Sequence, residues 1–276
     1  MLTPEQKEVR RNYIGGSDAA AIAGMSKYAT PLDVYLDKLG LAEEKEETQP
    51  MYWGKRLEQV IVDEYSRVTG RNVQQVDSII SKEYPFMIAN IDGYVPEENI
   101  VVECKNVNAF RANQFGPTDT DEMPTEFILQ CAHYAIVTNC KRVDLAVLLG
   151  GNEFRIYQYN RNERLEKQLV ALERNFWENH VIPHIPPEPI NYRDVLTLWP
   201  KSDDEKTLTA TGTMIMALDR MKETKTKIKQ LEEEEEKHKV ELTKLLGDAS
   251  VLVDADGNKL ATWKTGKTNN RTFRLS

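Results

Sequence analysis

The chain has 276 residues, enough for one large domain or for one domain with an appendage. Its hydrophobic content of 40% and charged content of 29% are ordinary for a globular protein, and no apolar run approaches the roughly 18 residues that a membrane span needs. The first residues form no apolar signal core, and the three cysteines show no paired spacing. We therefore expect reduced thiols, no membrane association and a cytoplasmic location.

The net charge of −8 excludes a protein coated with positive charge for binding a polyanion. Residues 1–190 hold 29 acidic and 20 basic residues, whereas residues 191–276 hold 15 and 16. A surface for nucleic acid in the first part must therefore be a local patch within an acidic body. Carboxylates gathered around a bound cation fit this balance, because the cation offsets their charge.

Helices are predicted for most of the first 70 residues. Residues 13–24 read as a glycine turn that leads into a short helix capped by Ser17 or Asp18. Thr30 followed by Pro31 is a typical helix start, and the helix that it opens ends at Gly40. Apolar residues at helical spacing predict a longer helix over about 51–69.

The pattern then changes to short β-branched and aromatic segments, which predict strands at 73–80, 86–94 and 100–105. A helix over 125–138, two strands within 142–159 and a helix over about 162–180 follow. This alternation predicts an α/β domain with a mixed sheet flanked by helices, over residues 1–190.

Residues 191–276 are predicted to form a separate C-terminal module after the proline-rich segment 181–189. Met214, Met221, Ile228 and Leu242 lie at multiples of seven residues, which favours a helical hairpin or an imperfect coiled coil within 207–246. Residues 250–265 read as a β-hairpin that turns at Asp256-Gly257.

The strand around Glu103 carries the residues with the clearest chemistry. Side chains alternate along a strand, so Glu103 and Lys105 share one face while Cys104 points into the core. Asp92 lies eleven residues upstream, and a hairpin would bring it beside Glu103. Two carboxylates and the main-chain carbonyl of Cys104 are the hard oxygen ligands that Mg²⁺ prefers, and Mn²⁺ is expected to substitute.

The Asp…Glu-x-Lys pattern is short, and it also arises where an aspartate caps a turn near an exposed Glu–Lys pair. The neighbouring segments therefore decide between a metal site and this structural interpretation. Five segments stand in one order: IGGSDAAAIAG (14–24), WGKRLEQVIVDEY (53–65), NIDGYV (90–95), VVECKN (101–106), and Gln130 with His133-Tyr134. Together they resemble the YqaJ-type phage recombinase nucleases, which are similar to lambda exonuclease. The resemblance spans about residues 10–160 and implies the restriction-endonuclease-like PD-(D/E)xK fold, magnesium dependence and degradation of duplex DNA from 5′ ends.

The resemblance also implies roles for individual residues. Asp92 and Glu103 match the metal-binding carboxylates and Lys105 matches the catalytic lysine. Glu58 matches a glutamate near the metal, and Gln130 matches a glutamine that supports the catalytic centre. Without the resemblance, Glu58 would be interpreted as a solvated helix charge, and Gln130 as a helix residue satisfied by the backbone. The "PD" element reads Ile91-Asp92 here, without proline.

A second group of residues is expected to bind the 5′-phosphate. Ser17 matches the serine of the lambda-type phosphate motif, and the matching arginine is either Arg10 or Arg11. Arg111 falls where the family places a further arginine. Free N–H groups at the helix start after Gly16 would add to such a site. Taken alone, the glycine pair is consistent with a simple tight turn and the arginines with surface charges.

The function expected from these observations is a magnesium-dependent exonuclease, 5′→3′ on linear double-stranded DNA, that generates 3′ single-stranded tails for phage-type recombination in the host cytoplasm. An endonuclease on the same fold and a catalytically inactive DNA-binding scaffold stay open as alternatives. The iron–sulfur branch of these nucleases needs four cysteines. The chain has three, so we do not expect an iron–sulfur cluster. Expected partners are double-stranded DNA ends, further copies of the chain (a trimer by resemblance) and a single-strand annealing protein.

Overall fold

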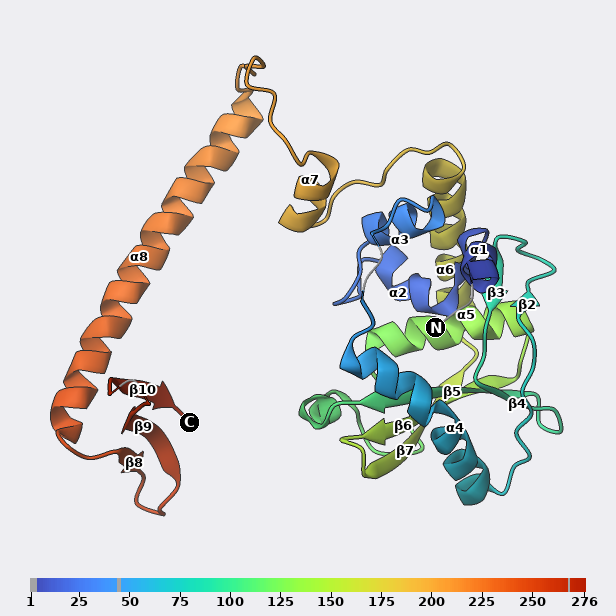
Figure 1. The fold of residues 1–276 in the computed structure, drawn as a ribbon, viewed down its shortest axis with the longest axis horizontal. Coiled ribbons are helices and arrows are strands. Elements are labelled where there is room, and N and C mark those ends of the chain that lie inside the picture. The colour runs from blue at the N-terminus through green and yellow to red at the C-terminus, as the bar shows by residue number, and fades with distance from the viewer. Residues whose placement is uncertain (1–3, 44–45, 268) are drawn as a thin grey trace. The chain divides into compact units, whose positions relative to one another are not determined.

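The fold was analysed in a computed structural model that describes residues 4–43, 46–267 and 269–276. The chain forms two compact units, Met1–Lys201 and Ser202–Ser276, which are described separately. Both are visible in Figure 1, where the first unit runs from blue to yellow and the second is orange to red. Within the described residues, no helix combines the length and apolar character required to cross a membrane.

A four-stranded mixed sheet lies at the centre of the first unit, in the order β4 (Gly93–Val95), β5 (Ile100–Val107), β6 (Arg142–Leu149) and β7 (Glu153–Asn160). The pairs β4–β5 and β6–β7 are antiparallel, whereas β5 and β6 run parallel. A parallel pair needs a crossover connection. That crossover carries a 3₁₀ helix, Ala109–Gln114, and α5 (Thr125–Thr138).

Two helices cover opposite faces of this sheet (Figure 1). On one face, α4 (Gln49–Thr69) packs Ile61, Val62 and Tyr65 against β5 and β6. On the other face, α5 packs against the alternate residues of the same strands, in a core that includes Leu145 and Val147. The sheet is therefore a middle layer, and each of its central strands is apolar on both faces.

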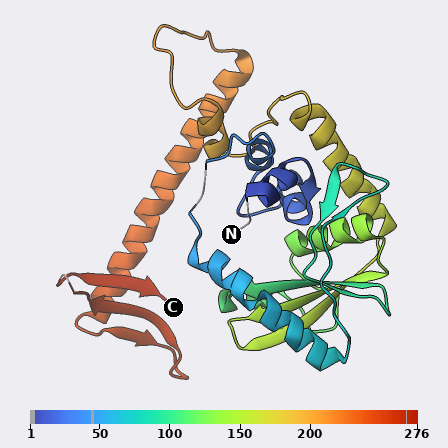
Figure 2. The same cartoon turned by 45° about the vertical axis from the view of Figure 1, so that its right-hand side comes forward.

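The remaining elements of the first unit surround the far side of α5. A small sheet has the order β1 (Ile14–Gly15), β3 (Met87–Ala89), β2 (Ile79–Ile80). Around it lie α1 (Pro4–Arg11), α2 (Gly16–Ile22), α3 (Pro31–Lys38) and α6 (Glu163–Phe176), which continues as a π-helical turn, Trp177–Val181. Figure 2 shows α2 and α6 on the side of α5 that faces away from the large sheet.

The unit ends with α7 (Tyr192–Leu198), which lies beyond the boundary predicted at residue 190. Asp194 of α7 is buried and accepts a hydrogen bond from the Thr30 hydroxyl at 3.0 Å. Arg193 forms an ion pair with Asp33. These contacts with the start of α3 hold the segment after the proline-rich stretch against the first unit.

The second unit consists of one long helix and a small sheet. The helix α8 (Gly212–Leu246) is continuous, so a single helix replaces the helical hairpin that was one of the two predicted forms. The strands β8 (Val251–Val253), β9 (Lys259–Thr265) and β10 (Arg271–Leu275) form an antiparallel sheet. The predicted turn at Asp256-Gly257 joins β8 to β9, and a third strand extends the predicted hairpin.

Most predicted elements of the first unit are present, with three differences. The strand predicted at 86–94 is instead two short strands, β3 and β4, which belong to different sheets and leave Asp92 between them. The short helix after the glycine turn begins at Gly16 with Gly15 as its N-cap, so the prediction of Ser17 or Asp18 as the cap was wrong. Asp18 instead accepts a hydrogen bond from the Gly15 N–H at 3.0 Å. Of the strand predicted at 73–80, only Ile79–Ile80 is a strand, together with an isolated bridge at Gln74.

Candidate active site

Asp92, Glu103 and Lys105 converge at the edge of the large sheet. Asp92 precedes β4, and its Oδ2 accepts a hydrogen bond of 2.7 Å from the Cys104 N–H of β5. The β4–β5 pairing places Gly93 opposite Val102. Because the N–H and C=O groups of one strand residue point to the same edge, the Cys104 carbonyl also faces Asp92.

Alternation along β5 places Glu103 and Lys105 on one face and Cys104 on the other, as predicted. Val102 and Cys104 belong to the cluster beneath α4, while Glu103 and Lys105 face α5. Lys105 Nζ forms an ion pair with Glu103 Oε1. Burial alone would lower the pKa of Lys105, but the Glu103 carboxylate outweighs it, so the pKa lies above its ordinary value. Lys105 is therefore an ammonium group in this arrangement.

Glu103 is the most buried carboxylate of the site, with 3% of its surface exposed. Burial raises its pKa to about 8, and the nearby Asp92 carboxylate adds to the rise against the opposing effect of Lys105. Its Oε1 accepts a hydrogen bond from Gln130 at 2.7 Å. Its Oε2 is buried and has no hydrogen-bond partner among the described residues. A buried oxygen without a donor is costly unless something else satisfies it.

Gln130 connects this site to the glycine turn. The same Nε2 that reaches Glu103 also donates to the Tyr134 hydroxyl at 3.0 Å, one helical turn away on α5. The ring of Tyr134 packs directly on Gly16, where an added Cβ would lie 2.5 Å from the ring. Gly16 therefore allows α2 to approach α5 closely, which places the turn around Ser17 near the carboxylates.

Glu58 approaches the site from α4 on the opposite face. It lies on the exposed side of its helix, yet partial burial and, secondly, the Asp92 carboxylate raise its pKa. Within the described residues no hydrogen bond joins Glu58 to Asp92 or Glu103. The structure thus brings Glu58 within electrostatic reach of the pair without direct contact.

The oxygen donors at this point suit a hard divalent cation. The unpartnered Glu103 Oε2, the Asp92 carboxylate and the Cys104 carbonyl form the set, and Mg²⁺ takes few protein ligands because it keeps several waters. In the described part of the chain, no three His, Cys, Asp or Glu side chains gather closely enough to hold a metal ion. The set therefore depends on a main-chain oxygen as its third protein ligand.

The residues predicted to bind a 5′-phosphate fall into different surroundings. Arg10 Nη2 donates to the Ser17 hydroxyl at 3.1 Å and to Asp18 Oδ1 at 3.3 Å. The guanidinium of Arg11 instead lies against Gly40. Of the two arginines, only Arg10 therefore shares a site with Ser17.

The cation Lys38 belongs to the same cluster and was not predicted from the sequence. Its side chain is fully buried, and Nζ donates to Asp18 Oδ2 at 2.6 Å and to the Arg10 carbonyl at 3.3 Å. Burial alone would raise the pKa of Asp18, but Lys38 and Arg10 together lower it. The Thr30–Pro31 start signal placed Lys38 in a helix, but nothing local reveals a partner twenty residues upstream.

Arg111 follows β5 on the 3₁₀ helix, apart from the Arg10 cluster. It forms an ion pair with Glu126 of α5, donates to Gln114 at 3.0 Å and reaches the Tyr28 hydroxyl at 3.5 Å. Its guanidinium also lies 5.7 Å from the ring centre of Phe127. Glu126 had no predicted role, although it sets the position of this arginine.

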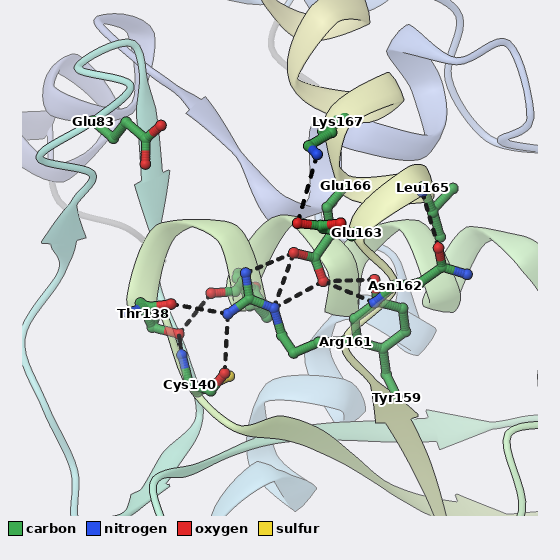
Figure 3. Close-up of polar contacts among 12 residues, drawn as sticks. Glu83, Thr138, Cys140, Tyr159, Arg161, Asn162, Glu163, Leu165, Glu166 and Lys167 are labelled. Atoms are coloured by element: carbon green, nitrogen blue, oxygen red, sulfur yellow. Dashed lines mark hydrogen bonds and ion pairs between the residues drawn. The ribbon is translucent and has the colours of Figure 1, made fainter.

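A groove of about 670 Å³ lies at the other end of α5, between β2, the loop after it and α6. Four of its charged groups form two ion pairs, Arg161 with Glu166 and Lys167 with Glu163, and Arg161 also donates to the Cys140 carbonyl (Figure 3). None of the candidate site residues lines this groove. We assign it no part in the chemistry described above.

Comparison with known proteins identifies relatives of the first unit. Residues 5–141 match the model of the YqaJ-like viral recombinase domain. The uncharacterized protein YqaJ of Bacillus subtilis is 32% identical over 177 residues, which are 63% of this chain and 54% of that protein. The chain thus spans about half the length of this relative.

Solved structures share the fold at low sequence identity. The alkaline exonuclease LHK-Exo of Laribacter hongkongensis has a TM-score of 0.54 and 19% identity, covering 66% of this chain and 94% of that one. Its complex with dAMP gives the same values. A protein of Eubacterium rectale has a TM-score of 0.50 and 12% identity, covering 78% and 98%. The mixed sheet flanked by helices is thus the restriction-endonuclease-like fold, and over residues 5–141 the chain is similar in sequence to the YqaJ-like viral recombinase domain.

Proposed function

We propose that the chain is a magnesium-dependent exonuclease that degrades linear double-stranded DNA from its 5′ ends and leaves 3′ single-stranded tails for recombination. The observation that carries the proposal is the convergence of Asp92, the Cys104 main chain and the buried, unpartnered Oε2 of Glu103. The similarity to the recombinase domain and the fold shared with an alkaline exonuclease support the same function.

Asp92, Glu103 and the Cys104 carbonyl would hold the cation, either Mg²⁺ or Mn²⁺. Bound there, it would supply a hydroxide nucleophile near neutral pH and offset the charge of a phosphate. Lys105, paired with Glu103, would orient or deprotonate the attacking water and stabilise charge on the phosphate oxygens. Gln130 keeps Glu103 in place by donating to Oε1.

The Arg10–Ser17 pair would bind the terminal 5′-phosphate. A guanidinium and a hydroxyl side by side are suitable donors to phosphate oxygens, and the exposed Ser17 makes the site accessible to an end. The buried Lys38 neutralises the charge of Asp18, so the positive charge of Arg10 would stay available to the 5′-phosphate. Arg111, which the resemblance also assigns to the 5′-phosphate, is held by Glu126 and would be a further contact for the DNA. The homo-oligomer, the annealing partner and the cytoplasmic location stay predictions.

The test is digestion of end-labelled linear duplex, with and without a 5′-phosphate, beside covalently closed circles, in Mg²⁺ and in chelator. We expect release of 5′-terminal nucleotides in Mg²⁺ only and intact circles. Lys105→Ala should abolish cleavage while sparing DNA binding. Arg10→Ala should remove the preference for 5′-phosphorylated ends, and Arg11→Ala, the matched control, should keep it.

Three results would contradict the proposal. Rapid loss of closed circles would identify an endonuclease on this fold. DNA binding without cleavage under any metal condition would indicate an inactive scaffold. Full activity of Lys105→Ala would show that the assigned site is not the catalytic one.

A further inference from the structure

The helix α8 leaves an apolar stripe uncovered along most of its length, with Leu242 and Leu246 near its end partly buried. None of its 35 residues is fully buried. Among the apolar residues of the stripe, Met221 and Ile228 are half exposed and Leu231 is 64% exposed. Near its start, an apolar hollow is lined by Leu208, Ala210, Met214, Ala217, Leu218 and Met221. Helices in proteins take most of their stability from packing an apolar face, so a polar helix of this length calls for a partner.

The stripe has the period of a two-stranded coiled coil. With Met214 as the first core position, successive core positions are every third and fourth residue: Met214, Ala217, Met221, Thr224, Ile228, Leu231, Glu235, His238, Leu242 and Leu245. Polar residues interrupt the stripe at Thr224, Glu235 and His238. A partner helix must therefore accommodate the Glu235 carboxylate in the seam, which is the interface formed by the core positions of the two helices.

The charge of α8 changes sign along its length. The first half is basic, with Arg220, Lys222, Lys225, Lys227 and Lys229, whereas residues 232–236 are five consecutive glutamates. A helix of this kind is complementary to an antiparallel copy of itself, because each basic half then lies beside an acidic half.

We propose that α8 pairs with α8 of a second copy of this chain as an antiparallel two-stranded coiled coil. In the register centred between residues 228 and 231, Ile228 of one copy faces Leu231 of the other. Met214 then faces Leu245, and Ala217 faces Leu242. Glu235 faces the neutral Thr224. Met221 faces His238, and the other large apolar residues of the seam each meet an apolar partner.

The residues that flank this seam are complementary at every charged position except Lys239, which lies beside Leu218. Arg220 lies beside Glu241 of the second copy, and Lys227 lies beside its Glu234. On the other flank, Lys225 lies beside Glu232. The parallel arrangement would place Glu235 against Glu235 and Arg220 beside Lys225. It would also place Lys227 beside Glu232 and Glu234 beside Lys239. Opposite charges thus flank the parallel dimer too, but the Glu235 pair in the seam and the Arg220–Lys225 pair make it less favourable than the antiparallel form.

Disulfide trapping in the full chain tests both the partner and its direction. The double variant Met214→Cys, Leu245→Cys should give a covalent dimer under mild oxidation, with positions 214 and 245 linked in peptide mass spectrometry. The two positions lie about 46 Å apart within one helix, so the link must join two chains. The three native cysteines are buried, which leaves the introduced thiols as the accessible ones.

The single variant Met214→Cys is the matched control. It should stay uncrosslinked, because antiparallel pairing separates the two 214 positions. Efficient linkage of this variant to itself would establish the parallel form and overturn the proposal. Absence of the 214–245 link, with the chain monomeric or bound through α8 to a different protein, would overturn it as well.

Association measured by sedimentation gives an independent readout. Ile228→Asp with Leu231→Asp should weaken α8 pairing by at least about 100-fold, since both apolar residues leave the seam. Thr226→Asp with Gln230→Asp adds the same charge on the outer face and should change little. Lys227→Glu should weaken pairing and Glu234→Lys in the same chain should restore it; failure of that rescue contradicts the antiparallel register.

Discussion

Glu103 is fixed by residues from three parts of the chain. Lys105 comes from its own strand, Gln130 from α5, and Asp92 from the segment before β4. Its second oxygen lacks a donor among the residues described. Oε1 of Glu103 is fixed by hydrogen bonds while Oε2 is free to bind a cation. This arrangement suits a metal ligand, because the oxygen is already in position before the ion binds.

Substitution of Gln130 tests this positioning role. Gln130→Leu removes the hydrogen bond to Glu103 Oε1 but keeps a similar side-chain volume, so we expect a fall in cleavage rate on the order of 10–100-fold with DNA affinity retained. Single-turnover cleavage and a separate binding titration measure the two effects. The ionised side chain of the Gln130→Glu variant cannot donate a hydrogen bond, so this variant should lower the cleavage rate as Gln130→Leu does. Unchanged rates in both variants would show that Glu103 does not depend on this contact.

Part of the site follows from the sequence because it depends on local geometry. Strand alternation places Glu103 and Lys105 on one face, and a short hairpin brings Asp92 to the same edge. The contacts of Lys38 and Tyr134 do not follow in this way. They join segments that are distant in sequence, and burial of a lysine against Asp18 is exceptional for its residue type.

At the scale of elements, α5 connects the sheet that carries the site to the helices behind it. Gln130 reaches β5, while His133 points the other way, towards α6 and the small sheet. His133 is fully buried, with Nε2 at 3.0 Å from the Ile88 carbonyl and Nδ1 at 3.0 Å from Glu173. Both nitrogens donate if the ring is an imidazolium.

The charge on His133 makes a pH-dependent contribution to stability. Burial alone would lower its pKa, but the Glu173 carboxylate outweighs it and the pKa lies above the ordinary value. A raised folded-state pKa contributes stability below about pH 6.5, which is lost as pH rises through the folded pKa. His133→Gln leaves Glu173 buried without its cation, which should cost about 3–5 kcal/mol at pH 6.

Urea unfolding of the wild type and His133→Gln at several pH values measures this contribution. The difference in free energy of unfolding should shrink as pH rises above 6.5. The control His184→Asn changes an exposed histidine at positive φ, which asparagine tolerates, and should show no such trend. A difference that is constant or grows with pH would mean that His133 is not charged in the folded protein.

Elements with strong local signals were predicted well. The Thr30 cap with Pro31 begins α3, and Gly70, in the left-handed conformation, ends α4. The strand predicted at 73–80 is mostly irregular, because only Gln74, in a bridge to Tyr94, and Ile79–Ile80 pair with another segment. The hairpin-or-coiled-coil prediction for 207–246 resolved into one helix, since a period of seven fits both forms.

At the scale of the whole molecule, the proposed chemistry belongs to the first unit alone. The residues proposed for cation, phosphate and DNA contacts all lie within Met1–Lys201. The change in composition after residue 190 indicated a second module, but it could not reveal that α7 packs on α3 through Asp194. That contact joins residues 164 apart in sequence and has no local signal.

Binding of Mn²⁺ to the full chain, followed by the loss of the free-ion electron paramagnetic resonance signal, tests the central claim most directly. The wild type should bind Mn²⁺ saturably and Mg²⁺ should compete. Asp92→Asn and Glu103→Gln should each weaken binding on the order of tenfold or more, because each removes a charged oxygen ligand. The matched variant Glu122→Gln, outside the site, should bind like the wild type. Undiminished binding in Asp92→Asn and Glu103→Gln would show that these carboxylates do not share a cation.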